Sequence, residues 1–152
     1  MQNRRETLKQ GAVVAGLLAA TGLFPRYAAA AWNGQAFEAK SVADVMKAFG
    51  AGAPTASNDV TLTAPDIAEN GAVVPMGVAT TLPNVKQMLI LVEKNPNTLV
   101  AKFDVNAAVE SNFLTRAKMG QTSDVYAVAI TNDGKALFTK KEVKVTLGGC
   151  GG

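Results

Sequence analysis

The chain has 152 residues, of which 48% are hydrophobic and 18% are charged, and its formal net charge is +3. This composition is typical of a globular protein of one domain, not of a disordered chain. The sequence contains no histidine and one cysteine, which excludes histidine-based nucleophiles, histidine-ligated zinc, blue-copper sites and internal disulfides.

The first thirty residues have the layout of an export signal. Arg4 and Arg5 precede the apolar run Gly11–Phe24, and the alanines of Ala28–Ala31 offer an A-x-A cleavage site. The apolar run is shorter than the roughly twenty residues that a membrane span needs. An amphipathic helix of a soluble protein is the alternative, and Pro25 argues against it.

The same segment holds most of the charge imbalance. Of the 15 basic and 12 acidic residues, four basic and one acidic lie in the first thirty positions, so the remainder is formally neutral and predicts no nucleic-acid binding. The stretch Asn3–Lys9 resembles a twin-arginine signal, with Thr7 where phenylalanine is common. We predict a cleaved signal over residues 1–30, after Ala30 or Ala31, and a periplasmic mature chain with no membrane association.

The first element of the mature chain is predicted to be a short helix. Ser41 can cap it, with Asp44 in the capping-box position, and Gly50 ends it. Its apolar residues fall on one face: Val42, Val45, Met46 and Phe49.

From residue 60 onward the apolar pattern has period two, which is typical of strands. Pro75 and Gly77 indicate an edge strand or a bulge in the second strand, and the continuous apolar run at 87–93 predicts a central one. Asn132–Gly134 predicts a hairpin. The strands are expected at 60–64, 72–80, 87–93, 99–105, 113–119, 125–130 and 137–147.

This pattern predicts an all-β protein, an immunoglobulin-like antiparallel β-sandwich over residues 31–147 with a short N-terminal helix. Leu147 is the last alternating apolar residue, so the sandwich should end there. Residues 148–152 then form a flexible C-terminal arm in which the only cysteine, Cys150, lies between two pairs of glycines: Gly148, Gly149, Gly151 and Gly152. An extended arm of that length reaches at most about 17 Å.

The thiol of Cys150 is predicted to be functional. In an exported protein an unpaired exposed cysteine is prone to oxidation and mixed disulfides, so an inert one is a poor alternative. The nearest basic side chain along the chain is Lys144, and the terminal carboxylate is close, so the expected pKa is the usual value of about 8.5. A covalent carrier tolerates that pKa, because each enzyme that it visits can activate the thiol.

Together, the leader, the β-sandwich pattern and the ending GGCGG resemble the SoxY family, the sulfur-carrier subunits of the periplasmic thiosulfate-oxidising (Sox) system. Residues Pro65–Val78 also resemble that family's N-terminal sheet region. The resemblance implies a non-catalytic carrier without cofactor or metal, which holds sulfur on Cys150 while the four glycines form a swinging arm. It implies a heterodimer with a SoxZ-like β-sandwich subunit.

The resemblance also implies the enzymes that the carrier visits. A c-type cytochrome enzyme couples thiosulfate to the cysteine, a thiosulfohydrolase releases sulfate, and in some organisms a sulfane dehydrogenase oxidises the remaining sulfur. An intermolecular disulfide through Cys150 is a further hypothesis, and its absence on non-reducing gels in air would count against it.

Two other functions stay open from the sequence. One is a carrier that uses a terminal Gly-Gly carboxylate, and the export signal argues against it because the ATP-dependent activating enzymes are cytosolic. The other is a secreted immunoglobulin-like interaction module with an incidental tail. Lys140, Lys141 and Lys144 are interpreted as a solvated strand face, and three methionines as core or interface residues: Met76, Met88 and Met119.

Overall fold

The computed structural model describes residues 6, 8–13, 16 and 33–147. It divides the chain into two units, residues 1–32 and residues 33–152. In the first unit, the described residues are helical and exposed. Arg4 and Arg5 lie outside the described residues, so the signal stays a prediction. Among the described residues, no helix is long and apolar enough to span a membrane.

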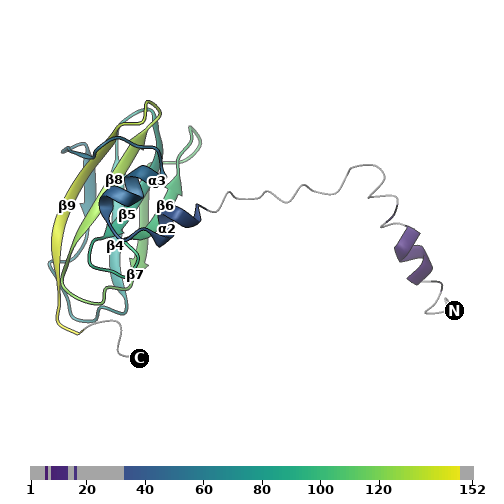
Figure 1. The fold of residues 1–152 in the computed structure, drawn as a ribbon, viewed down its shortest axis with the longest axis horizontal. Coiled ribbons are helices and arrows are strands. Elements are labelled where there is room, and N and C mark those ends of the chain that lie inside the picture. Colours follow the sequence, from purple (N-terminus) through teal and green to yellow (C-terminus); the bar gives the residue numbers. More distant parts are fainter. Residues whose placement is uncertain (1–5, 7, 14–15, 17–32, 148–152) are drawn as a thin grey trace. The chain divides into compact units, whose positions relative to one another are not determined.

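The second unit contains a six-stranded sheet (Figure 1). Its strands follow the order β1-β9-β8-β5-β6, and β3 pairs with β9 on the same edge as β1. The long strands pair antiparallel, whereas the two-residue strands β1 and β3 pair parallel to β9. Their bounds are β1 Thr55–Ala56, β3 Ile67–Ala68, β5 Val85–Val92, β6 Leu99–Asp104, β8 Ser123–Thr131 and β9 Ala136–Val145.

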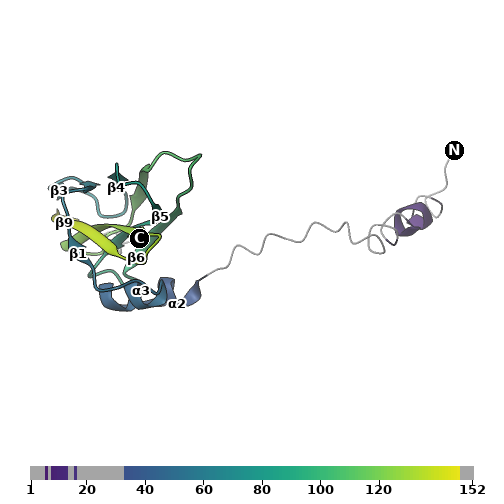
Figure 2. The same ribbon diagram turned by 90° about the horizontal axis from the view of Figure 1, so that it is seen from above.

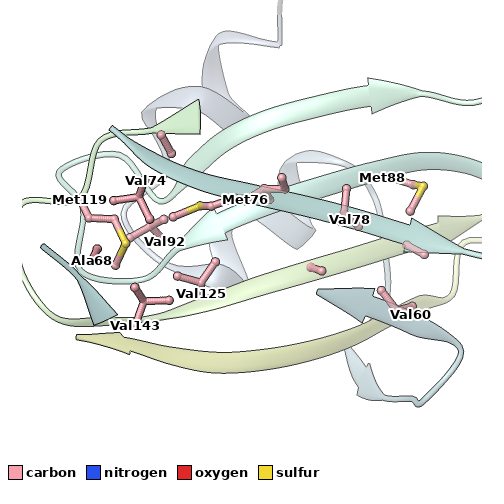
Figure 3. Close-up of a cluster of buried hydrophobic side chains, with 14 of the residues drawn as sticks. Val60, Ala68, Val74, Met76, Val78, Met88, Val92, Met119, Val125 and Val143 are labelled. Atoms are coloured by element: carbon pink, nitrogen blue, oxygen red, sulfur yellow. The ribbon is translucent and has the colours of Figure 1, made fainter. Parts of the chain in front are cut away.

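A second, three-stranded antiparallel sheet has the order β2-β4-β7, with β2 at Val60–Thr63, β4 at Val74–Thr80 and β7 at Asn112–Ala117. The main core lies between the two sheets, and both contribute buried side chains to it (Figure 3). The prediction of an all-β sandwich is therefore confirmed. Its physical basis is the period-two pattern, which gives each strand one apolar face for this core.

Two short helices, α2 (Gly34–Glu38) and α3 (Val42–Ala48), cover the other face of the larger sheet (Figure 2). Strand β5 shows the consequence. Ile90 and Val92 belong to the core between the sheets, whereas Leu89 and Leu91 pack in the cluster with the helices. Because both faces of β5 are buried, its sequence is continuously apolar, and the prediction of a central strand is confirmed.

The predicted helix is confirmed as α3, and its ends follow local chemistry. The Ser41 hydroxyl accepts a hydrogen bond from Asp44 N at 3.1 Å and donates one to the Asp44 carboxylate at 2.6 Å. Gly50 has a φ of 62°, its N–H donates to Lys47 O, and Ala51 N donates to Met46 O. This pair of bonds is the Schellman arrangement that glycine favours.

Replacing Ser41 with alanine should destabilise the protein by about 1 kcal/mol, because the N–H of Asp44 loses its acceptor. The measurement is the free energy of unfolding in urea. Threonine at the same position keeps the hydroxyl and is the matched control. Equal losses for the alanine and threonine variants would contradict a capping role.

Helix α2 was not predicted. The Asn33 side chain caps it by accepting from Ala36 N at 3.1 Å, and Asn33 Nδ2 donates to Ala48 O at 2.9 Å. Asparagine is a common N-cap, so a local signal existed. A helix of five residues, however, depends on its packing against α3 and the sheet, because so short a helix is marginal alone.

The predicted hairpin at Asn132–Gly134 is confirmed as the turn between β8 and β9. Gly134 has a φ of 83°, a conformation that glycine adopts without steric cost. Thr131 N donates to Lys135 O at 3.0 Å and Gly134 N donates to Thr131 O at 3.0 Å. The turn fixes the register in which Ile130 faces Ala136.

The prediction that the strand with Pro75 lies at an edge or contains a bulge is wrong. Strand β4 is the middle strand of the smaller sheet and keeps one register with both neighbours. Strand β2 ends at Thr63, opposite Gly77, so at Pro75 only β7 is a neighbour. Pro75 therefore has a side without a partner strand, as its missing N–H requires.

Candidate functional site at the end of strand β9

The predicted site residues Cys150, Gly148, Gly149, Gly151 and Gly152 lie outside the described residues. The structure describes the chain as far as Leu147, three positions before the cysteine. The described residues that precede them in the chain are those at the end of β9, and the predicted arm departs from this part of the sandwich.

Backbone hydrogen bonds hold both sides of this last segment. On one side, Lys144 N donates to Asp66 O at 3.0 Å and Thr146 N donates to Ala68 O at 3.1 Å. On the other side, Val145 N donates to Thr122 Oγ1 at 3.0 Å. The backbone is thus paired beyond the last residue of the strand.

A further pair of bonds links the very end of the described chain to the core. Gly71 N donates to Leu147 O at 2.8 Å, and Gly71 O accepts from Met119 N at 2.7 Å. The side chain of Met119 is fully buried. The Thr146 hydroxyl adds a bond to Glu69 O at 3.0 Å. Residues beyond Leu147 therefore start from a fixed point on the sandwich.

The burial along β9 shows where the core stops. Val143 is fully buried beside Val125 (Figure 3), Val145 is partly buried, and the side chain of Leu147 is 69% exposed. Strand β9 ends at Val145. The apolar alternation of β9 therefore continues in the sequence as far as Leu147, although the core no longer covers the side chain at that position.

The lysines of β9 are partly neutralised. Lys140 Nζ lies 2.7 Å from the Asp124 carboxylate, and Lys141 Nζ lies 2.7 Å from that of Asp66. The hydrogen bond with Asp124 raises the pKa of Lys140. Lys144 is exposed and has no ion pair within the described part of the chain. The interpretation as a solvated strand face agrees with these pairs, because paired charges do not form a basic patch.

The three methionines are core residues, which is one of the two roles predicted for them, core or interface. Met76, Met88 and Met119 are at most 1% exposed and pack in the cluster between the sheets (Figure 3). The flexible thioether side chain fills irregular gaps in such a core. Within the described residues, no group of three or more Cys, Asp or Glu side chains is placed to hold a metal ion.

A groove of about 850 Å³ lies beside the smaller sheet, where Pro75, Leu114 and Arg116 line it. Gly77 of β4 lies opposite Leu114, one of these lining residues. A Cβ there would lie 2.5 Å from Leu114 Cδ2, so the leucine side chain lies over the glycine. No predicted site residue lines this groove, and no pattern in the sequence indicated it.

A family model described as "Sulfur oxidation protein SoxY" matches residues 45–150. The solved structure of the sulfur carrier protein SoxY from Chlorobium limicola f thiosulfatophilum matches with a TM-score of 0.61 and 34% identity, over 68% of this chain and 93% of that one. These matches place the protein in the class of sulfur carrier proteins that take part in sulfur oxidation. The chain belongs to the SoxY family.

Other matches show the fold alone. Superoxide reductase (neelaredoxin) from Ignicoccus hospitalis has a TM-score of 0.51 and 16% identity, over 58% of this chain and 80% of that one. A putative superoxide reductase from Thermotoga maritima has a TM-score of 0.52 and 13% identity, over 60% of this chain and 92% of that one. No curated protein matches the sequence.

Proposed function

We propose that this chain holds sulfur intermediates covalently on the thiol of Cys150 and presents them to partner enzymes of thiosulfate oxidation. The observation that carries the proposal is the extent of the family match, which runs through the anchored end of β9 and includes Cys150. A thiol suits this cargo, because S–S bonds form and break by thiolate attack and leave the carrier reusable.

The glycines around Cys150 form the arm in this proposal. Gly148 and Gly149 connect the thiol to the fixed end at Leu147, and Gly151 and Gly152 follow it. Without side chains, such an arm fits a narrow pocket, and glycine can adopt different backbone conformations in different pockets. Each binding event has an entropic cost, which weakens binding and favours release.

The first step is the oxidative coupling of thiosulfate. The Cys150 thiol loses its proton, its sulfur bonds to the outer sulfur of thiosulfate, and two electrons pass to the c-type cytochrome enzyme. In the second step, a thiosulfohydrolase adds water across the bond to the terminal sulfone group. Sulfate and a proton leave, and a persulfide stays on Cys150. A sulfane dehydrogenase, where present, oxidises that remaining sulfur. The carrier itself supplies only the thiol and performs no catalysis.

Membership of the SoxY family supports a proposal for the partner and the location. The chain pairs with a SoxZ-like β-sandwich subunit in a heterodimer and works in the periplasm. Residues 1–30, with Arg4 and Arg5, direct export by the twin-arginine route and are then removed. That route carries folded proteins, so a partner without its own signal can be exported in the same complex.

Intact mass spectrometry of the mature protein from cells grown on thiosulfate tests this function. We expect added mass equal to whole sulfur atoms or to a thiosulfate group, located on the C-terminal peptide and removed by a reductant. The same preparation from cells grown without thiosulfate is the control. An unmodified Cys150 under thiosulfate growth would contradict the proposal and favour the interaction module.

A further inference from the structure

Three large apolar side chains are exposed around the end of β9. Ile67 is 57% exposed, Val73 is 56% exposed and Leu147 is 69% exposed. We call these three residues the root rim. Single exposed apolar side chains are normal on proteins, so the exposure alone indicates nothing. What distinguishes these three residues is their position near the start of the predicted arm.

The root rim lies at one end of the sandwich. Ile67 is in β3, beside β9 (Figure 2), where it pairs with Lys144. Val73 ends the turn that starts at Asn70, with its N–H donating to Asn70 O at 3.4 Å, and Gly71 in that turn bonds to Leu147 O. All three side chains therefore project from backbone that is hydrogen-bonded at or near the last described residue.

The length of the remaining chain makes this position significant. Cys150 is the third residue after Leu147, and three extended residues span about 10 Å. When the thiol occupies a pocket of another protein, the surface around Leu147 is thus held within about 10 Å of the reacting sulfur. A pocket of that depth brings its mouth against the root rim.

The charges near the root rim do not favour one sign. Asp66 is paired with Lys141, and Glu69 and Lys144 are exposed with opposite charges. A strongly charged pocket mouth would therefore meet no region of opposite charge on this surface. An apolar pocket mouth would bury the three side chains, and their removal from water would stabilise the contact.

We propose that Ile67, Val73 and Leu147 form a docking surface that packs against the apolar mouth of the pockets in which partner enzymes act on sulfur at Cys150. This proposal rests on the proposed function of Cys150. It assigns a second task to the end of the sandwich, which is to align the arm with the pocket through contacts that do not depend on the arm's own conformation.

The test is a triple variant, Ile67→Thr, Val73→Thr and Leu147→Gln, in the complete mature carrier with its partner subunit. The readout is the thiosulfate-coupling reaction catalysed by the purified c-type cytochrome enzyme, with the carrier as the varied substrate. We expect the KM for the carrier to rise roughly tenfold with little change in kcat, because the docking contact is lost and the thiol is not. Reaction of Cys150 with a small maleimide should be unchanged.

The matched control is Val109→Thr. Val109 is also exposed, at 39%, and lies in the loop after β6. That loop follows Asp104, which pairs with Gln87 near the start of β5, whereas β9 ends near the start of β8, where Val143 pairs with Ser123. The control residue is therefore at the opposite end of the sandwich, and its KM should stay at the wild-type value.

Equal KM values for the triple variant and the control would overturn the proposal while leaving the carrier function intact. A change in the subunit composition of the triple variant by sedimentation, with unchanged KM, would instead make the root rim a subunit interface and would also overturn it. If the wild-type carrier accepts no sulfur at Cys150, both the docking surface and the proposed function fail.

Discussion

Under the proposed function, replacing Cys150 with serine should abolish every sulfur adduct on the protein and reduce thiosulfate oxidation by the reconstituted system to background. Serine has nearly the same shape but cannot form the S–S bond that coupling to thiosulfate requires. The fold should be unaffected, because the two clusters of buried side chains that form the core come from residues of the sandwich and its helices. The measurements are intact mass after incubation with thiosulfate and the coupling enzyme, and the thermal unfolding midpoint.

Gly151→Ala is a suitable control, since it changes the arm next to the cysteine and keeps the thiol. We expect this variant to load with sulfur. A serine variant that still carries sulfur would show that another group holds it and would favour the terminal carboxylate of a Gly-Gly carrier. A loss of thermal stability equal to that of a core variant would show that the tail is part of the fold.

Replacing Ile90 with alanine should destabilise the sandwich by about 2–5 kcal/mol. Ile90 is fully buried in β5 and packs in the core between the two sheets. Truncation removes the apolar contacts and leaves a cavity that neighbouring strands cannot fill, because β8 and β6 pair with β5 on both sides. A loss of this size is a large part of the typical stability of a single domain.

The same substitution at Ile67 is the control, because that isoleucine is 57% exposed in the edge strand β3. Its cost should be about 0.5 kcal/mol or less. Urea unfolding of both variants gives the two free energies directly. Similar values would mean that the burial of β5 does not determine the stability of the sandwich.

The sequence by itself was sufficient for features that depend on local chemistry. Ser41 and Gly50 bound α3, because a hydroxyl acceptor and a positive φ act on the nearest backbone groups. Gly134, which also has a positive φ, determines the turn between β8 and β9 in the same local way. The chemistry proposed for Cys150 is local in the same sense, because a lone thiol between glycines allows few roles whatever the fold.

Alternation also predicted most strands correctly, since the side of a strand that faces a core is a property of period two. The continuous apolar run in β5 predicted a central strand, and the structure explains the run by placing Leu89 under the helices and Ile90 between the sheets. The apolar run itself did not indicate which elements would cover the two faces of β5.

Only the tertiary structure determined where each strand has neighbours and where the opposite sheet stops covering the core. Pro75 lies in the middle strand of its sheet because β2 stops opposite Gly77, and a local rule about proline contains no information about the length of a partner strand. Strands β1 and β3 are two residues long, too short for any period, and exist because the edge of β9 offers hydrogen-bonding partners. Leu147 continues the alternation of β9 yet is exposed, since burial requires an opposite surface, and only the assembled sandwich shows that none of its described residues covers this position.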